Sequence, residues 1–361
     1  MSDTIRTAPF TLTTGDYLRH YLISYFRMYI VLPWAPFMWL LTFGIPILAG
    51  FRHLTHREYL AFATSNLWYS VIWLTLIPAI GLFTTWRSLG RIETTYAQRV
   101  ATLDSHAFAL DGDGFSNHQV WSSFRRVIET PGNVYLVLRA GSAMIVPKRA
   151  FASPIIAKQF LAEARKHVRH AGHKQVQAFY DHIDAPEPMA GLVSPSFRMR
   201  FGVYFRYCLL VMCRSMLRPT TLIFLLAAFV GFPAWLQRDR LAAGDWRGVL
   251  ISSIPGLIFF MVVFPLVMTL ISWATVARQP AVRGERQVSL AADEVQARGD
   301  AYDVKVRWNN IRQVSQTWGL ILLWSGPSGA IVVPRTAFAD PAAADAFLDQ
   351  ARALWQAAKS A

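Results

Sequence analysis

One long segment of the chain occurs twice at a fixed distance. WSSFRRVIETPGNVYLVLRAGSAMIVPKRAFASP starts at Trp121 and matches WNNIRQVSQTWGLILLWSGPSGAIVVPRTAFADP, which starts at Trp308, a shift of 187 residues. The same shift places Arg19 on Arg206 and Phe160 on Phe347 without a gap. A single shift that holds over most of the chain predicts a tandem duplication, in which each half is one structural unit.

Each half also contains two long stretches that carry no charged residue. A helix that crosses a bilayer needs about 20 mostly apolar residues. We therefore predict four membrane-spanning helices, one hairpin in each half. The uncharged stretches lie between Arg27 and Arg52, Glu58 and Arg87, Arg218 and Arg238, and Arg247 and Arg278.

The formal net charge is +14, and most of the basic residues lie beside these stretches and between the two predicted hairpins. Lysine and arginine mark the cytoplasmic side of membrane proteins. We therefore expect a multi-pass protein of the bacterial inner (cytoplasmic) membrane, with both termini and both polar domains in the cytoplasm. The sequence has no basic recognition helix and no aromatic RNA-binding motif, so nucleic acid is not an expected partner.

From Arg99 onward the pattern changes to the alternation typical of strands. After Pro154 it becomes helical, and the second half ends in a helix expected over Asp340–Ala358. Each half is predicted to hold a small antiparallel sheet or barrel capped by a C-terminal helix, which makes the fold class membrane α-helical hairpins plus α+β. The candidate strands of the first half are Arg99–Leu103, Ala107–Leu110, Phe115–His118, Phe124–Glu129, Val134–Arg139 and Ala143–Pro147.

These patterns divide the chain into six predicted parts. Before each hairpin, an amphipathic helix is expected either to lie at the membrane interface or to extend the span that follows. The parts are an N-terminal segment with its interfacial helix (1–28), hairpin 1 (29–88), β-rich domain 1 (92–172), a linker (173–200), the second lead-in with hairpin 2 (201–278) and β-rich domain 2 (283–358).

The paired spans, the Trp-x-x-Phe/Ile-x-x-Val segment and the Val-Pro-Lys/Arg-x-Ala-Phe block resemble the YcxB-like family of bacterial membrane proteins. The resemblance implies that the β-rich domain is pleckstrin-homology-like (PH-like), and it implies no settled biochemical activity. The usual member has one unit, so the duplication is a departure. The matching positions are Trp121, Val127, Pro147, Lys148, Ala150 and Phe151, and then Trp308, Val314, Pro334, Arg335, Ala337 and Phe338.

Few residues suggest chemistry. His167, His170 and His173 have a spacing that could bind zinc or nickel, but basic residues interleave with them and solvated helix-end charges are the favoured interpretation. No nucleophile, phosphate-binding or metalloprotease motif occurs, so we expect no enzyme activity and no cofactor.

Lys148, Arg149 and Arg335 follow the Val-Pro step in matching loops and could contact anionic headgroups or an acidic partner. Solvated loop charges that help to orient the chain are the alternative, and favoured, interpretation. The leading hypothesis is a non-enzymatic membrane protein with a scaffold or binding role, whose two PH-like domains bind lipid headgroups or a partner protein. The alternatives are a regulatory or immunity-type membrane protein that inhibits one specific partner and, third, a small-solute channel or transporter. The two halves are expected to pack together as a pseudo-dimer.

Overall fold

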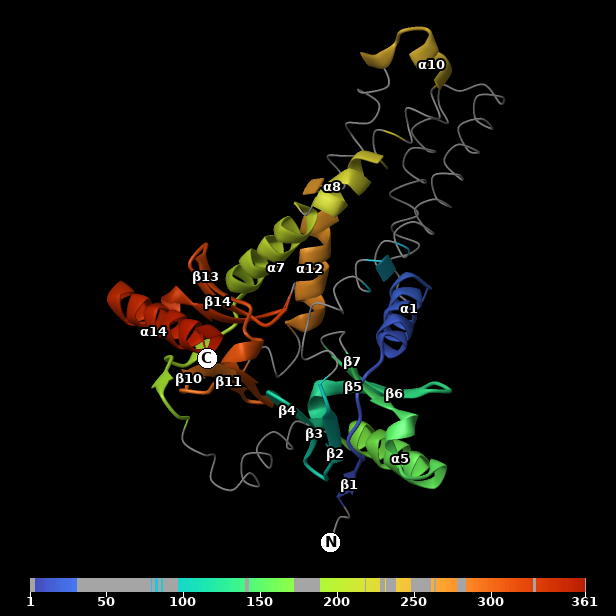
Figure 1. Cartoon of the computed structure of the whole chain (residues 1–361), viewed down its shortest axis with the longest axis vertical. Coiled ribbons are helices and arrows are strands. Elements are labelled where there is room, and N and C mark those ends of the chain that lie inside the picture. The colour runs from blue at the N-terminus through green and yellow to red at the C-terminus, as the bar shows by residue number, and fades with distance from the viewer. Residues whose placement is uncertain are drawn as a thin grey trace.

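The structure is a computed structural model (Figure 1). It describes residues 4–30, 97–139, 143–171, 189–217, 219–227, 238–247, 264–277, 284–326 and 329–360, with the separate positions 79, 82, 83, 86, 231, 261 and 262.

The first half forms two antiparallel groups of strands and a closing helix. The first group is β1 (Ile5–Arg6), β2 (Arg99–Leu103), β3 (Ala107–Gly112) and β4 (Phe115–Val120), and the second is β5 (Phe124–Glu129), β6 (Asn133–Leu138) and β7 (Ala143–Pro147). A 3-10 turn at Trp121–Ser123 separates the groups, and α5 (Pro154–His170) follows. The strands predicted from alternation are present, with bounds that differ by at most two residues.

The second half repeats this order. Its first group is β8 (Leu192–Val193), β9 (Phe197–Arg198), β10 (Glu285–Leu290), β11 (Glu294–Gly299) and β12 (Tyr302–Arg307). Its second group is β13 (Gln313–Thr317), β14 (Leu320–Trp324) and β15 (Ala330–Pro334), followed by α14 (Pro341–Ser360). The pairing repeats at the 187-residue shift, since Ile5 lies opposite Leu103 in one half and Leu192 opposite Leu290 in the other.

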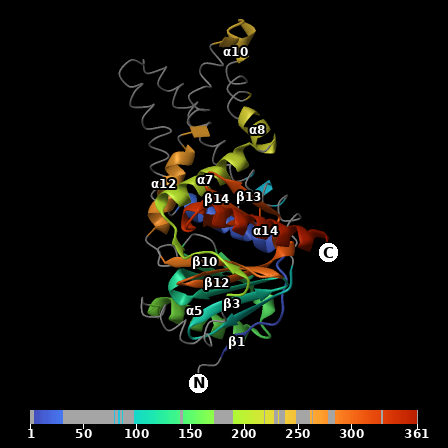
Figure 2. The same cartoon turned by 90° about the vertical axis from the view of Figure 1, so that its left-hand side faces the viewer.

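The two halves share one sheet. Strands β4 and β12 pair antiparallel with Asn117 opposite Val304, which joins both first groups into a nine-stranded sheet (Figure 2). The contacts at this junction are reciprocal, because Val120 N donates to Ala301 O (3.2 Å) and Arg307 N donates to Gly114 O (3.0 Å). The halves therefore meet through a strand ladder.

Each half has a core built on the same aromatic positions. In the first half Trp121 is fully buried, and its Nε1 donates to the carbonyl oxygen of Asp104 (2.8 Å). In the second half Trp308 Nε1 donates to Ala291 O (2.9 Å). A buried indole is stable when its N–H group is hydrogen bonded. These two hydrogen bonds therefore stabilise each tryptophan at the 3-10 turn, where the two strand groups of its half meet.

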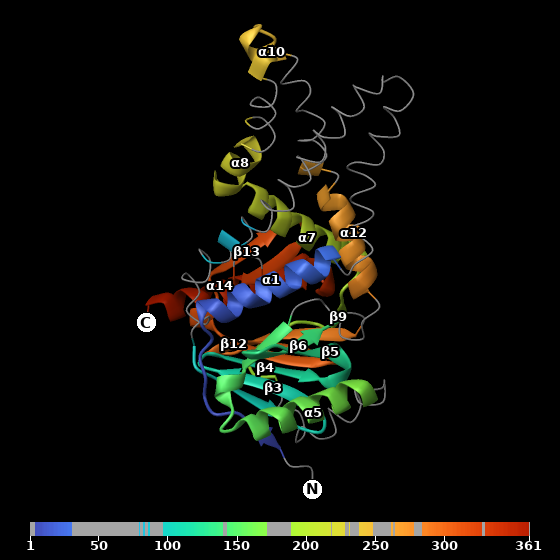
Figure 3. The same cartoon turned by 90° about the vertical axis from the view of Figure 1, so that its right-hand side faces the viewer.

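The predicted interfacial helices are α1 (Thr14–Ile30) and α7 (Phe201–Met216), and both pack on strands. The sheet β5–β7 lies between α1 and α5 (Figures 1 and 3). His20 of α1 stacks on Tyr135, with ring centroids 5.5 Å apart. On α7, Val203 is buried against Leu322 and Trp324 of β14. Both helices are thus part of the β-rich units rather than separate lead-ins to hairpins.

The prediction of membrane hairpins is corrected by the remaining helices. Within the described ranges, every helix is either too short or too polar to traverse a bilayer. In the third and fourth predicted spans, the described helices are α8 (Pro219–Leu226) and α12 (Phe264–Val276), of 8 and 13 residues. A short helix α10 (Arg238–Ala242) stands between them in the chain. The first two predicted spans fall almost wholly outside the described residues.

The four-span fold class is therefore wrong for the described part of the chain, and the inner-membrane, multi-pass localisation is overturned by the same finding. The error has a physical origin. The prediction of spans was based on the number of residues between successive charged residues, which reflects only local hydropathy. Crossing a bilayer requires in addition one unbroken helix of about 20 residues.

Candidate ligand pocket in the second half

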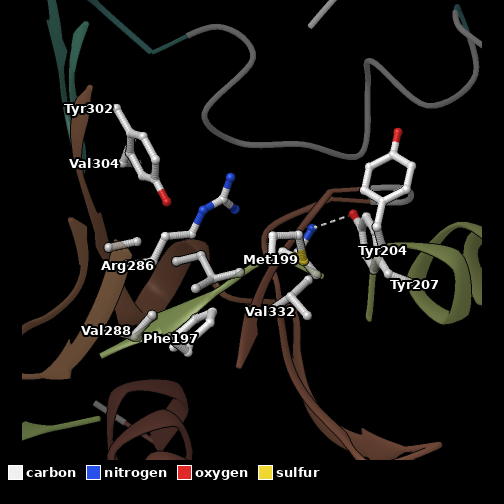
Figure 4. A pocket seen from close by; sticks show the side chains of 12 residues that line it. Phe197, Met199, Tyr204, Tyr207, Arg286, Val288, Tyr302, Val304 and Val332 are labelled. Carbon is white, nitrogen blue, oxygen red and sulfur yellow. Dashed lines mark hydrogen bonds between the residues drawn. The ribbon is translucent and has the colours of Figure 1, made fainter. Parts of the chain in front are cut away.

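A pocket of about 320 Å³ lies in the second half, between the shared sheet and α7 (Figure 4). Arg286 and Tyr302 lie on its sheet side, Tyr204 and Tyr207 come from α7, and Met199 lies between them. The remaining lining residues are Phe197, Val288, Ala297, Val304, Ala330, Ile331 and Val332. The walls are thus mainly apolar, with a few polar groups, which is the usual composition of small-molecule sites.

Arg286 supplies the positive charge of the pocket. Its backbone lies in β10, opposite Gly299 of β11 and Phe197 of β9. Its side chain lies on the face of the sheet that borders the pocket, as does that of Val288 two residues later. Its guanidinium carbon lies 5.6 Å from the centroid of the Tyr302 ring, a cation–π distance. None of the twelve lining residues, all of them in the described part of the chain, is acidic.

The tyrosines of the pocket are neutral at physiological pH. Burial raises the pKa of Tyr302 and of Tyr207, and it raises the pKa of Tyr204 to about 12 against the opposing effect of a hydrogen bond with Ser272. Tyr207 accepts a hydrogen bond at its hydroxyl from Ala330 N (3.2 Å), which ties α7 to β15. Tyr204 is hydrogen bonded to Ser272 of α12 and so is directed toward that helix.

The equivalent place in the first half is arranged differently. Arg99, which corresponds to Arg286, lies 5.2 Å from the centroid of the Phe115 ring, as Arg286 does over Tyr302. However, Arg99 Nη2 donates to the hydroxyl of Tyr17 (2.9 Å), and Tyr17 corresponds to Tyr204. Tyr17 therefore bonds to the first arginine, whereas Tyr204 bonds to Ser272 of α12, and Arg286 lines the pocket.

The predicted basic residues each have a carboxylate partner. Lys148 Nζ lies 2.7 Å from Glu129 Oε1, and Arg335 Nη1 lies 2.7 Å from Asp345 Oδ1. Arg149 Nη2 donates to the buried Asp16 (2.7 Å). Lys148 and Arg149 follow β7, Arg335 follows β15, and none of the three lines the pocket. Their binding role stays a prediction.

The histidine run is divided between different environments. His167 stacks on Trp121, with ring centroids 5.1 Å apart and an interplanar angle of 16°, and burial lowers its pKa. His170 Nδ1 lies 2.8 Å from Lys166 O, and His173 lies outside the described residues. Among the residues that are described, no three histidine, cysteine or acidic side chains are grouped so that they could hold a metal ion.

The repeat-signature residues occupy structural positions. Phe151 packs on Phe160, with centroids 5.0 Å apart, and Phe338 packs on Phe347 at 5.3 Å. Pro147 ends β7 opposite Asn133, and Pro334 ends β15 opposite Leu320. These residues, with Trp121 and Trp308, belong to or border the two cores.

Sequence reasoning missed the pocket. The 187-residue shift does align Arg99 with Arg286 and Tyr17 with Tyr204. The arginine near the start of a strand in both halves is the one sequence feature that could have indicated this site. It does not indicate that Tyr17 and Tyr204 form hydrogen bonds with different partners.

No curated protein and no solved structure matches the chain. Residues 103–164, which run from the end of β2 into α5, match the family of YcxB-like proteins, so the resemblance expected from the sequence is confirmed for this part of the first half.

Proposed function

We propose that the chain is a non-enzymatic binding protein made of two PH-like units, and that the pocket of its second unit holds a ligand. The observation that carries the proposal is a pocket of about 320 Å³ with apolar walls and one arginine. Pockets that combine apolar walls with a few placed polar groups are typical ligand sites.

Two features support the PH-like, duplicated character of the units. In each half, one group of strands is followed by a three-stranded sheet and a closing helix. The second half reproduces this order, its cross-strand partners and its buried tryptophan at the same shift. Tandem duplication of one unit is the simplest source of such agreement.

The side chains of the pocket favour binding over catalysis. General acid–base catalysis near neutral pH needs a group whose pKa lies close to the operating pH. The titratable lining groups are Arg286 and three tyrosines, and burial raises the pKa of all three tyrosines. Such groups orient a ligand by charge and hydrogen bonding without moving its protons.

Binding of anionic headgroups or an acidic partner through Lys148, Arg149 and Arg335 is a rival proposal. Each of these side chains would have to give up a carboxylate at 2.7 Å to contact such a partner. The pocket combines apolar walls with a few polar side chains, which is the usual composition of a ligand site, and for this reason we favour it.

The test is a titration of the full chain with N-phenyl-1-naphthylamine, a neutral fluorescent probe of apolar sites. We expect saturable binding of one probe per chain. Met199→Trp fills the pocket and is expected to weaken binding by about tenfold or more, which corresponds to roughly 1.4 kcal/mol. Met199→Leu, which keeps a similar volume, serves as the control and is expected to bind as the original chain does. Equal binding by both variants would contradict a site in this pocket.

A further inference from the structure

We infer that the ligand of this pocket is an uncharged, mainly apolar molecule of about ten non-hydrogen atoms. The inference rests on the proposed function, because it assumes that the pocket binds a ligand, and it adds the charge, polarity and size of that ligand. The polar wall groups, the apolar walls and the differences from the first half each support this class of ligand.

The polar side chains of the walls already interact within the chain. The guanidinium of Arg286 lies over the ring of Tyr302 and has a further interaction with the protein. The two tyrosine hydroxyls of α7 are bonded to Ala330 N and to Ser272. An ionic ligand group would lose its water at these walls and would have to compete with these contacts. Because burial of an ion without full compensation is costly, the walls disfavour a charged ligand.

A cationic ligand is disfavoured for a second reason. None of the twelve described lining residues is acidic, so a bound cation would meet no carboxylate among them. The one charged residue in this set is Arg286, which has the same sign as the cation. Burial raises the pKa of all three lining tyrosines, so no phenolate supplies a negative charge at neutral pH. An uncharged ligand meets none of these costs.

The walls offer mainly apolar surface (Figure 4). Met199, Val288 and Val332 present thioether and aliphatic groups, and Phe197 presents an aromatic ring. Apolar surface that is buried against such walls is stabilised without a directed bond. A volume of about 320 Å³ equals the space of roughly ten water molecules in the liquid. A body of about ten carbon atoms is therefore a suitable size.

The first half carries a larger and a more polar residue at two corresponding positions. Leu110 takes the place of Ala297 and is buried in the core of the first half. Asn117 takes the place of Val304. In the second half, alanine instead of leucine leaves space, and valine instead of asparagine makes the wall apolar. Both differences favour an apolar occupant.

The experiment compares decan-1-ol with decanoate and decylammonium on the full chain at neutral pH, by displacement of N-phenyl-1-naphthylamine. The three compounds share a ten-carbon chain and differ in the charge of the end group, and each is used below its micelle concentration. We expect decan-1-ol to displace the probe at about tenfold lower concentration than either ion, which corresponds to roughly 1.4 kcal/mol.

Two substitutions introduce first-half residues into the pocket. Ala297→Leu fills part of the space and is expected to weaken binding of decan-1-ol by about tenfold. Val304→Asn places an amide in the wall and is expected to weaken it by about threefold or more, because the amide would lose water to an apolar ligand. Asn117→Val, the reverse exchange in the first half, is the control and is expected to leave binding unchanged. Thermal unfolding of each variant shows whether it is folded.

The outcomes separate the two proposals. A preference for decan-1-ol below about threefold, or a preference for either ion, would overturn the uncharged class and leave the binding pocket in place, provided that the probe binds. Unchanged binding of decan-1-ol by folded Ala297→Leu and Val304→Asn would also overturn the inference, because the alcohol would then bind elsewhere. A probe that binds Met199→Trp and Met199→Leu alike would instead contradict the proposed function itself.

Discussion

Asp16 and Arg149 form an ion pair at 2.7 Å although 133 residues separate them in the chain. Asp16 is almost completely buried and also accepts a hydrogen bond from Thr13 N (2.9 Å), so it acts in the cap of α1 as well. The pair joins the start of α1 to the turn after β7. The corresponding positions in the second half are Val203 and Thr336, which cannot form this pair.

Asp16→Asn is expected to lower the free energy of unfolding by about 2 kcal/mol at pH 7, because it weakens the helix cap and leaves Arg149 without its charged partner. Urea denaturation measures this change. Asp113→Asn is the control, since the Asp113–Arg307 pair is exposed and its loss is expected to change stability by less than about 0.5 kcal/mol. Equal effects of the two substitutions would show that the buried pair has no special role.

The same aspartate predicts a dependence on pH. Burial raises the pKa of Asp16, but hydrogen bonds from Arg149 and Thr13 outweigh it and lower the pKa from 3.8 to about 2. A lowered pKa stabilises the fold above the unfolded value, and this contribution is lost as the pH falls from about 4 toward 2. The difference in unfolding free energy between the original chain and Asp16→Asn is therefore expected to shrink over this window. A difference that stays constant from pH 5 to 2 would contradict the assignment.

Asn310 tests the junction between the halves. Its Nδ2 donates to Gly114 O across the junction (2.9 Å), so Asn310→Ala is expected to lower the free energy of unfolding by about 1 kcal/mol. The neighbouring Asn309 is exposed and offers only its backbone carbonyl, to Lys359. Asn309→Ala should therefore be close to neutral. Denaturation of both variants in parallel decides whether the side-chain contact contributes.

His167→Leu tests the structural role of the histidine run. The position that corresponds to His167 in the second half is Leu354, which packs against the core there. Because burial lowers the pKa of His167, its contribution to stability is expected to fall as the pH decreases through about 6.5. The leucine variant should be at least as stable at pH 7 and lose less stability at pH 5. Thermal unfolding at both pH values measures this, and a loss of stability at pH 7 would assign the imidazole a necessary contact.

The local elements of the β-rich units could be predicted from the sequence, since strand alternation and Gly/Pro turns depend on neighbouring residues. Phe124–Glu129 and Ala143–Pro147 have the predicted bounds. Neighbouring residues do not determine which other strand an edge strand pairs with. The pairing of β4 with β12 across the halves was therefore missed, as was the division of each unit between two sheets.

The candidate site could not be predicted for a related reason. Arg99 and Arg286 occupy equivalent positions, and so do Tyr17 and Tyr204. Their different roles depend on Ser272, which lies 68 residues beyond Tyr204 and approaches it only in the folded chain. The basic residues Lys148 and Arg149 were chosen for their charge, whereas their carboxylate partners come from β5 and α1.

The ladder at Asn117 and Val304 also has a consequence for symmetry. In a dimer of two identical single units joined in this way, the residue on the two-fold axis would face its own copy. Every substitution in one unit would then also occur in the other. Here the two strands belong to one chain, so asparagine can face valine. One unit can therefore bond its arginine to its own tyrosine while the other contains a pocket, a structural difference that identical subunits could not encode.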